Sequence, residues 1–394
     1  MQLPMSLRCV GAAALFLCAL KVFWPAAAAA AEPAIFSLGL ISDVQWADAD
    51  DGWNYARTTR RCFRGALVQL TRAVDWWSSQ ELVAVAQLGD LVDGRNAAAG
   101  QSESAMAAAM GQLRRLSVRV LHAVGNHDLY NFPRPQLAAQ LHDADSYYAF
   151  MPHAGWRILV LDTFQESLIG WPEEDTRRVR ALNAIKAHNP NDVTVDGDWF
   201  AGLDGLERRW VPYNGALGAA QLTWLRRELR AARHAGERVL VLSHAILHPA
   251  ACDGTTLAWD YAEALQEIHR AGCVAAVIAG HDHAGGYHHD EHGVHHLTLR
   301  SPLNDGVDGA AYGVLDAAAD AVVLRSPQLF SLLPRRAEAR LPRPTDAGGG
   351  VQAMRFAIKA VPPARRRLRA DARRVGVPAL GERALAILER TAGN

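Results

Sequence analysis

The sequence predicts an α/β fold, and two observations support this prediction. Short aliphatic and β-branched runs alternate along the chain with longer amphipathic stretches, which is the strand and helix order of α/β proteins. Half of the 394 residues are hydrophobic and 21% are charged, an ordinary globular composition that can bury a sizeable core. The length alone allows either one large layered domain or two average domains.

The elements follow from the local pattern in chain order. A strand is expected at residues 35–41, then a helix at residues 58–77 and a strand at residues 82–88. Further strands are expected at residues 118–124, 157–161, 238–242, 274–279, 295–299 and 313–315. Helices are expected at residues 219–235 and 259–271.

Residues 1–31 are predicted to be a signal peptide. Arg8 precedes an apolar run at residues 10–20, and an alanine tract at residues 26–31 offers small residues for cleavage. Lys21 ends the run, which is shorter than the roughly 20 apolar residues of a spanning helix. We therefore expect export to the periplasm or the medium and no stable membrane insertion after cleavage. An anchor formed by the uncleaved segment is the alternative.

The charge balance gives no reason to expect a nucleic-acid partner. Basic and acidic residues total 41 each, so no global field attracts a polyanion. However, 14 basic and 5 acidic residues follow Pro334, which leaves 27 and 36 before it. Residues 335–394 are therefore predicted to be a basic tail rich in Pro, Arg and Ala, solvated and partly disordered. Binding to a membrane surface or a partner is the alternative.

The main domain is predicted at residues 32–334, with an insertion at residues 165–218. The insertion has weak periodicity and contains the segment Asn189-Pro190-Asn191-Asp192 with scattered glycine and tryptophan. Long insertions often form binding loops or lids, so we interpret this segment as a candidate substrate cap.

Five polar clusters each follow an apolar run. They are Asp43-Val44-Gln45, Gly89-Asp90-Leu91-Val92-Asp93, Gly125-Asn126-His127-Asp128, Ser243-His244 and Gly280-His281-Asp282-His283. Ligand sites in open α/β sheets lie outside the carboxyl ends of the strands, so these clusters can meet in one crevice. Carboxylate, amide and imidazole groups form a mixed oxygen and nitrogen ligand set. Each cluster alone suits turn or capping chemistry, but five together favour a metal site.

In this order the clusters resemble the motifs of the calcineurin-like metallophosphoesterase superfamily, over residues 35–312. The resemblance implies a four-layer α/β/β/α sandwich of two mixed sheets and a dimetal-dependent phosphohydrolase. It implies one metal ion held by Asp43, Gln45, Asp90 and His283, and a second held by Asp90, Asn126, His244 and His281. A hydroxide between the two ions would then attack phosphorus, because coordination lowers the pKa of water toward neutrality.

The resemblance implies a different role for His127, which is not a ligand in this scheme. Asp93 would position His127 to donate a hydrogen bond or a proton to the substrate or the leaving oxygen.

Gln45 stands where most members of the superfamily have histidine, and an amide oxygen favours Mn²⁺ or Mg²⁺ at this position. Residues 43–48, 51–55, 60–61, 87–90, 125–132, 213–217, 257–261 and 285–287 are similar to the manganese-dependent ADP-ribose/CDP-alcohol diphosphatases. This similarity implies two divalent ions, with manganese favoured and iron, zinc or magnesium open. It also implies a small nucleoside diphosphate-type substrate, ADP-ribose or a CDP-alcohol, with Tyr55, Thr256 and the insertion at the substrate.

Three departures from these relatives are expected near the pocket. His248 replaces an aromatic residue, Thr256 replaces a cysteine and Arg300-Ser301 replaces an acidic stretch. They bear on base or leaving-group preference more than on metal chemistry. An exported phosphomonoesterase or cyclic-nucleotide phosphodiesterase with the same metals is an alternative, and a non-catalytic scaffold is another. The intact ligand set argues against the scaffold, and the oligomeric state stays open.

A separate group of histidines lies between residues 288 and 296. His288, His289, His292, His295 and His296 suggest a second metal site. They flank a glycine and acidic residues, which are typical of a solvated hairpin, and we favour the hairpin interpretation.

Overall fold

A computed structural model describes residues 33–54, 56–141, 145–334 and 341–361 of the chain. The predicted signal peptide, Tyr55 and much of the predicted tail lie outside these described residues. Within the described part, no helix combines the length and the apolar character needed to cross a membrane.

The first of two main sheets has seven strands in the order β16-β17-β15-β14-β1-β4-β5. Its parallel strands are β1 (Phe36–Ile41), β4 (Ala84–Gln87) and β5 (Arg119–His122). Its antiparallel half contains β14 (Tyr312–Ala317), β15 (Ala321–Ser326), β16 (Thr345–Asp346) and β17 (Gln352–Ala357).

The second main sheet has six strands in the order β12-β13-β11-β10-β7-β6. Four parallel strands form its centre: β7 (Trp156–Val160), β10 (Arg238–Leu242), β11 (Val274–Ala279) and β13 (His295–Thr298). The antiparallel strands β6 (Tyr148–His153) and β12 (Gly286–His289) form its two edges.

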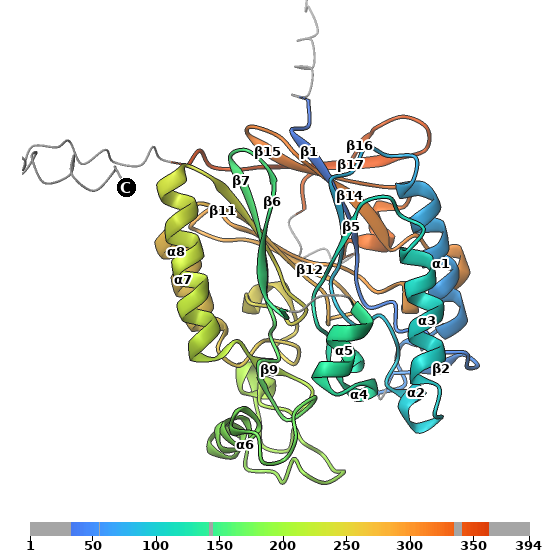
Figure 1. Ribbon diagram of the computed structural model, residues 1–394, viewed down its shortest axis with the longest axis vertical. Helices are drawn as coiled ribbons and strands as arrows, with labels where there is room; N and C mark the ends of the chain where they lie inside the picture. The colour runs from blue at the N-terminus through green and yellow to red at the C-terminus, as the bar shows by residue number, and fades with distance from the viewer. Residues whose placement is uncertain (1–32, 55, 142–144, 335–340, 362–394) are drawn as a thin grey trace, which may run out of the picture. The chain divides into compact units, whose positions relative to one another are not determined.

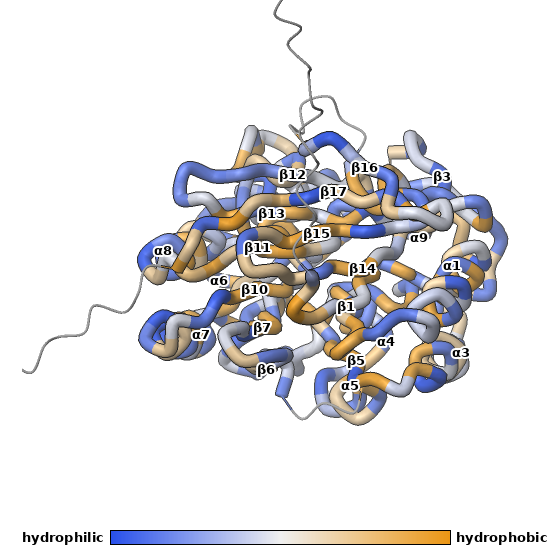
Figure 2. The backbone as a smooth tube through the Cα atoms, turned by 90° about the horizontal axis from the view of Figure 1, so that it is seen from above, coloured by the Kyte–Doolittle hydropathy of each residue, from blue (hydrophilic) through white to orange (hydrophobic). Residues whose placement is uncertain are grey.

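The two sheets pack face to face, and helices cover their outer faces (Figure 1). Along β10, Leu240 and Leu242 lie in the core between the sheets, whereas Val239 and Val241 pack toward the helices. This alternation is the period of two residues expected of a strand. Figure 2 shows apolar strands between the two groups of helices. The predicted four-layer α/β/β/α sandwich of two mixed sheets is confirmed.

The outer helices bury one apolar stripe each. The first sheet is covered by α1 (Phe63–Trp77) and α3 (Ser102–Leu113), and the second by α7 (Gly218–Ala235) and α8 (Tyr261–Ala271). In α7, Leu225, Leu229 and Ala232 are buried at helical spacing against the second sheet. The helix ends at Gly236, whose φ of 72° is a left-handed conformation that glycine adopts without strain.

Shorter elements complete the fold. The short α-helices are α2 (Arg95–Ala98), α4 (Asn126–Asn131), α5 (Arg134–Leu141), α9 (Pro302–Asp305) and α10 (Leu329–Leu332). The 3-10 helices are η1 (Gly205–Arg209), η2 (Pro249–Ala251) and η3 (Gly306–Asp308), and β2 (Gly52–Trp53) pairs with β3 (Arg60–Arg61).

The insertion contains more regular structure than its weak periodicity indicated. At its base, β8 (Glu166–Ser167) pairs with β9 (Gly215–Ala216), and between them α6 (Thr176–His188) begins after the capping side chain of Asp175. Figure 1 shows α6 beyond one end of the sheets.

The chain beyond Pro334 differs from the predicted solvated tail. The strand β17 pairs with β15 over six residues, and Met354 and Phe356 are buried between the two sheets. Basic composition concealed the alternation of Met354 and Phe356 with Arg355. The folded core therefore extends at least to Ile358, past the predicted boundary.

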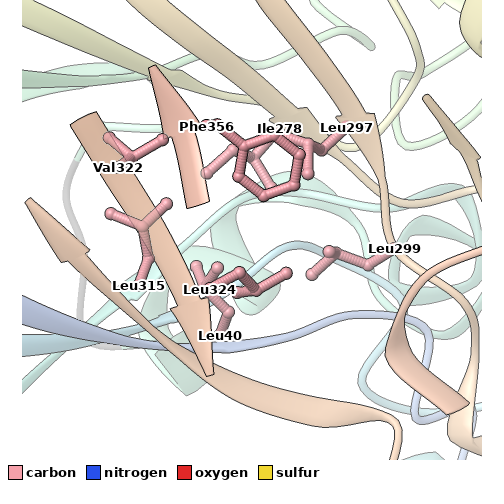
Figure 3. A pocket seen from close by; sticks show the side chains of 8 residues that line it. All are labelled: Leu40, Ile278, Leu297, Leu299, Leu315, Val322, Leu324 and Phe356. Atoms are coloured by element: carbon pink, nitrogen blue, oxygen red, sulfur yellow. The ribbon is translucent and has the colours of Figure 1, made fainter. Parts of the chain in front are cut away.

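The space between the sheets is closed to ligands where β17 packs. Figure 3 shows side chains from both sheets converging there, among them Leu40, Ile278 and Phe356. All eight residues lining this gap are apolar, and it has no volume that a water molecule could occupy. It is part of the core.

Candidate metal centre

The five polar clusters meet at one edge of the sandwich, where the parallel strands end. In the described part of the chain five non-glycine residues have positive φ, and four of them lie here: Asp43 (53°), Gln45 (44°), Asp90 (57°) and His281 (70°). Side-chain clashes make this conformation uncommon, so tertiary contacts must hold it. All four of these residues with a strained backbone are predicted metal ligands.

Two glycines allow the turns to approach each other. A Cβ atom at Gly125 would lie 2.1 Å from Oδ1 of Asp90, and one at Gly280 would lie 1.8 Å from Oγ of Ser42. Neither position has room for a side chain, which is the physical reason for glycine before Asn126 and His281.

Asp43, Gln45, Asp90 and His283 form one half of the centre. Nε2 of His283 lies 3.4 Å from Oδ1 of Asp43, and Nε2 of Gln45 lies 3.0 Å from Nε2 of His283 and 2.9 Å from Oδ2 of Asp90. Asp43, Gln45 and Asp90 are almost fully buried.

Asp90, Asn126, His244 and His281 form the other half. Nε2 of His244 lies 3.4 Å from Oδ2 of Asp90 and 3.2 Å from Nδ1 of His281. Donor atoms of these three residues all lie within 4.8 Å of one another. Asn126 begins α4 beside Asp90, because the next residue, His127, donates its backbone N–H to Oδ1 of Asp90 at 2.8 Å. Asp90 thus lies between the two halves, where the resemblance implied a bridging ligand.

The hydrogen bonds of two histidines fix which ring nitrogens face each other. Nδ1 of His244 lies 2.8 Å from the carbonyl oxygen of Leu88, and Nε2 of His281 lies 2.7 Å from Oδ1 of Asn214. Both acceptors require the proton on the ring nitrogen that faces them. The opposite nitrogens lie 3.2 Å apart, and when both rings are neutral they present two lone pairs to each other, an arrangement that a cation stabilises.

Three oxygens test whether a metal pair fits these residues. Oδ1 of Asp43, Oε1 of Gln45 and Oδ1 of Asn126 are buried, and no described residue donates a hydrogen bond to them. Buried polar atoms are otherwise almost always satisfied, and a divalent ion accepts oxygen lone pairs. Rotation of the Gln45 amide by a half turn brings its oxygen toward Asp90 and His283. The residues fit a pair of divalent ions.

The electrostatics of the site also favour cations. Burial would raise the pKa of Asp90, but His244 and His127 outweigh it and hold this pKa far below its usual value. Burial lowers the pKa of His244, whereas Asp90 and Asp43 raise it to about 9. Burial and the neighbouring His244 lower the pKa of His281 to about 3. The buried carboxylates therefore favour positive charge beside them, which either a protonated His244 or a bound cation would supply.

His127 lies beside the centre with a proton available. The backbone N–H of Gly94 donates to Nδ1 of His127 at 2.9 Å, so a neutral ring carries its proton on Nε2. Oδ2 of Asp93 lies 3.3 Å from the same Nδ1. Burial lowers the pKa of His127, but Asp90 and Asp93 outweigh it and raise this pKa above its ordinary value. The arrangement suits an acid whose charged form Asp93 stabilises.

Two supporting residues were not among the predicted site residues. The carboxylate of Asp128 accepts the backbone N–H groups of Asp90 (2.8 Å), Leu91 (2.9 Å) and Gly125 (3.1 Å), and so joins two of the turns. Asn214 reaches His281 from the insertion. Asp128 lies within a recognised cluster and Asn214 within the similar segment 213–217, but nothing in the sequence pairs Asn214 with His281.

The predicted substrate contacts have different outcomes. Tyr55 is outside the described residues. Thr256 follows Thr255, whose carbonyl oxygen accepts Nδ2 of Asn214 at 2.7 Å, so its loop reaches the centre through Asn214. The ring of His248 lies 4.4 Å from the rings of His288 and His296, and it therefore packs with the hairpin histidines.

Comparison with known proteins identifies this arrangement. The profile of the calcineurin-like phosphoesterases matches residues 36–285, a span that contains all five clusters. The chain belongs to the calcineurin-like phosphoesterase family. As a member of this family it is a metal-dependent hydrolase of phosphoric esters or diphosphates.

Several named proteins are similar to this chain over about three quarters of its length. Proteins called manganese-dependent ADP-ribose/CDP-alcohol diphosphatase are 34% identical over 321 residues in Mus musculus and 36% identical over 292 residues in Arabidopsis thaliana. These matches cover 76% and 73% of this chain and 93% and 92% of the relatives. The crystal structure of a dimetal phosphatase from Danio rerio has 35% identity and a TM-score of 0.70, and the match covers 74% of this chain and 96% of that one.

Proposed function

We propose that this phosphoesterase uses two manganese ions to hydrolyse the diphosphate of ADP-ribose or a CDP-alcohol. The observation that carries the proposal is the pair of facing ring nitrogens, Nε2 of His244 and Nδ1 of His281, which lie 3.2 Å apart and beside Asp90. The relatives that bear the diphosphatase name support the substrate class, because they are matched over nine-tenths of their length.

Manganese is favoured by the donor atoms. Asp43, Asp90, Gln45 and Asn126 would contribute oxygens, and the three histidines would contribute nitrogens. Oxygen donors suit Mn²⁺ and Mg²⁺, whereas imidazole nitrogens suit transition-metal ions, so a mixed set favours Mn²⁺ over Mg²⁺. When bound, the two ions would supply positive charge for the phosphoryl oxygens and lower the pKa of a coordinated water.

The residues of the chain would bind the substrate and move a proton. Nε2 of His127 would donate its proton to the leaving oxygen, and the carboxylate of Asp93 would stabilise the charged form of the ring. Arg61 is half-buried, and its Nε has no hydrogen-bond acceptor among the described residues, so a phosphate oxygen of the substrate could serve as the acceptor. Burial lowers the pKa of Arg61, while Asp93 and Asp90 oppose that effect, which indicates that this cation lies in the field of the centre.

We also propose that the reaction takes place outside the cytoplasm. The support is the signal-like sequence of residues 1–31. Amino-terminal sequencing of the protein recovered from cell fractions tests this proposal. An intact first residue in a cytoplasmic fraction would contradict it.

The test of the reaction uses metal-depleted protein with manganese or zinc restored. The substrates are ADP-ribose, CDP-choline, CDP-glycerol, cyclic nucleotides and an aryl phosphate, with every product identified. A diphosphatase yields two monophosphates and no free phosphate, and we expect this result with manganese above zinc. Free phosphate from an aryl phosphate would favour a phosphomonoesterase, and turnover of a cyclic nucleotide would favour a phosphodiesterase. Full activity of Asp90→Ala protein would overturn the metal assignment.

A further inference from the structure

The hairpin formed by β12 and β13 is not solvated as the sequence suggested. His288 lies opposite His296 in the antiparallel register, while the flanking pair Tyr287 and Leu297 belongs to the core between the sheets. His288 and His296 therefore share the outer face of the sheet, toward α8. His296 is only 2% exposed and Asp290, in the turn, is 5% exposed.

Further polar side chains converge on this face from other elements. Oδ2 of Asp290 lies 2.9 Å from Nε2 of His296 and 2.9 Å from Nε2 of His269, which lies on α8. His248 enters from the loop after β10 and stacks on His288 with a ring separation of 4.4 Å. We call the three residues His248, Asp290 and His296 the hairpin site.

We propose that the hairpin site binds a single zinc-class divalent ion, in addition to the two ions of the catalytic centre. One donor atom from each of its three residues lies within 4.8 Å of the other two. Two imidazoles and one carboxylate form the donor set of many three-ligand zinc sites, which leave a fourth position for water or another ligand. Metal–ligand bonds of about 2.0–2.2 Å place tetrahedral ligands roughly 3.4 Å apart, so small side-chain movements close the site.

Two of the donor atoms already face each other. Oδ2 of Asp290 lies 2.9 Å from Nε2 of His296, and both residues are buried. An ion bound by these two atoms would take the place of the proton on Nε2, and the ring would then carry its proton on Nδ1. Nδ1 of His296 has no hydrogen-bond partner among the described residues, so this change breaks no existing contact, although the buried N–H gains no acceptor.

Binding also has a cost at His248. Nδ1 of His248 accepts the backbone N–H of Ala250 at 3.1 Å, so the neutral ring carries its proton on Nε2. An ion at Nε2 requires this proton to move to Nδ1, and the contact with Ala250 is then lost. That contact lies at the surface, where water can replace His248 as the acceptor.

The hairpin site is separate from the catalytic centre. It shares no residue with the predicted ligands of the two metals. His296 pairs with Val277 on β11, four residues before His281, which corresponds to roughly 13 Å along an extended strand.

The position of the hairpin site indicates a structural role. An ion bound there would tie His248 and the start of η2 to the β12–β13 hairpin, where Oγ1 of Thr298 already donates to the carbonyl oxygen of Ala251. The same loop continues to Thr255, which holds Asn214. The ion would therefore stabilise the loop that supports the metal centre.

The experiment measures zinc binding to the full chain after removal of metal with a chelator. Equilibrium dialysis with metal analysis is expected to give three zinc equivalents for the wild type and two for His248→Phe. Phenylalanine keeps the ring packing of His248 and removes its donor atom. His296→Ala is the second variant, in case one of the two fails to fold. His289→Ala is the matched control, because His289 is exposed and faces the other side of the same strand.

A background without the catalytic ligands separates this inference from the proposed function. In Asp90→Ala/His244→Ala protein we expect one zinc equivalent to remain and to raise the melting temperature, and His248→Phe to weaken its binding at least tenfold. Cobalt in place of zinc should give visible absorption of a four-coordinate nitrogen and oxygen site. Two equivalents in the wild type, or a third that persists in both hairpin-site variants, would overturn the inference whatever substrate the enzyme cleaves.

Discussion

Nε2 of His281 and Oδ1 of Asn214 lie 2.7 Å apart and join the insertion to the metal centre. Nδ2 of Asn214 is itself held by the carbonyl oxygens of Arg209 (2.9 Å) and Thr255 (2.7 Å). Asn214 is fully buried, so its orientation is fixed from both ends. The insertion therefore supports the centre structurally, whatever it contributes to the substrate.

The first prediction concerns this contact. Asn214→Ala removes the acceptor that fixes the proton of His281 on Nε2, and we expect metal affinity to fall about 10-fold to 100-fold with the fold retained. Isothermal titration of metal-depleted protein with Mn²⁺ measures the loss. Asn191→Ala is the matched control, because Asn191 also binds carbonyl groups within the insertion but touches no predicted ligand. Equal Mn²⁺ affinity in both variants would show that Asn214 does not position His281.

A second prediction separates His127 from the ligands. His127→Ala is expected to lower kcat about 100-fold to 10,000-fold, the range of a general acid, while the metal content stays unchanged. Steady-state kinetics with metal analysis of the same preparation checks both statements. Loss of one metal equivalent from this variant would reassign His127 as a ligand.

The pH dependence of kcat tests the pairing of His127 with Asp93. Asp90 and Asp93 raise the pKa of His127 against the effect of burial, so His127 keeps its proton to higher pH than an isolated histidine. Asp93→Asn removes one of these charges, and the pKa of His127 falls. The alkaline limb of the kcat profile should therefore move to lower pH. Bound cations lower the pKa in both proteins, and the difference between the two profiles is the quantity to measure.

The elements that follow from the sequence are those determined by local burial. The strands β10 and β11 begin and end where the sequence predicted, because each is an aliphatic run buried on both faces. The five clusters were recognisable because each combines a turn with ligand-type side chains. Contacts such as Asn214 with His281 depend on an insertion that returns to the sheet edge, and no local pattern encodes that path.

For the hairpin histidines, the local sequence predicted the wrong environment. His288, Asp290 and His296 lie among glycine and acidic residues, and this composition favoured solvent exposure. The structure buries Asp290 and His296 because α8 and the loop after β10 pack over that face. Burial imposed by distant elements cannot be predicted from the neighbours of a residue in sequence.

A buried ion pair provides a stability prediction. Nη1 of Arg134 lies 2.6 Å from Oδ2 of Asp162, and both side chains are buried, with the guanidinium also over the ring of Trp171. Asp162→Ala leaves Arg134 as an uncompensated buried charge, which should cost about 3–5 kcal/mol of the free energy of unfolding. Urea denaturation measures this loss. Arg64→Ala, which breaks exposed ion pairs with Asp48 and Asp50, should give no measurable change.

The last prediction tests whether the chain beyond Pro334 belongs to the core. Phe356 is 1% exposed and packs 5.4 Å from the ring of Tyr287, so β17 contributes an aromatic side chain between the two sheets. Phe356→Ala should cost about 3–5 kcal/mol, because it removes buried area and leaves a cavity that the sheets cannot fill. Arg355→Ala is the matched control, since Arg355 is an exposed neighbour on the same strand. If both variants unfold at the same urea concentration as the wild type, β17 is not part of the folded unit, and the predicted boundary at Pro334 would stand.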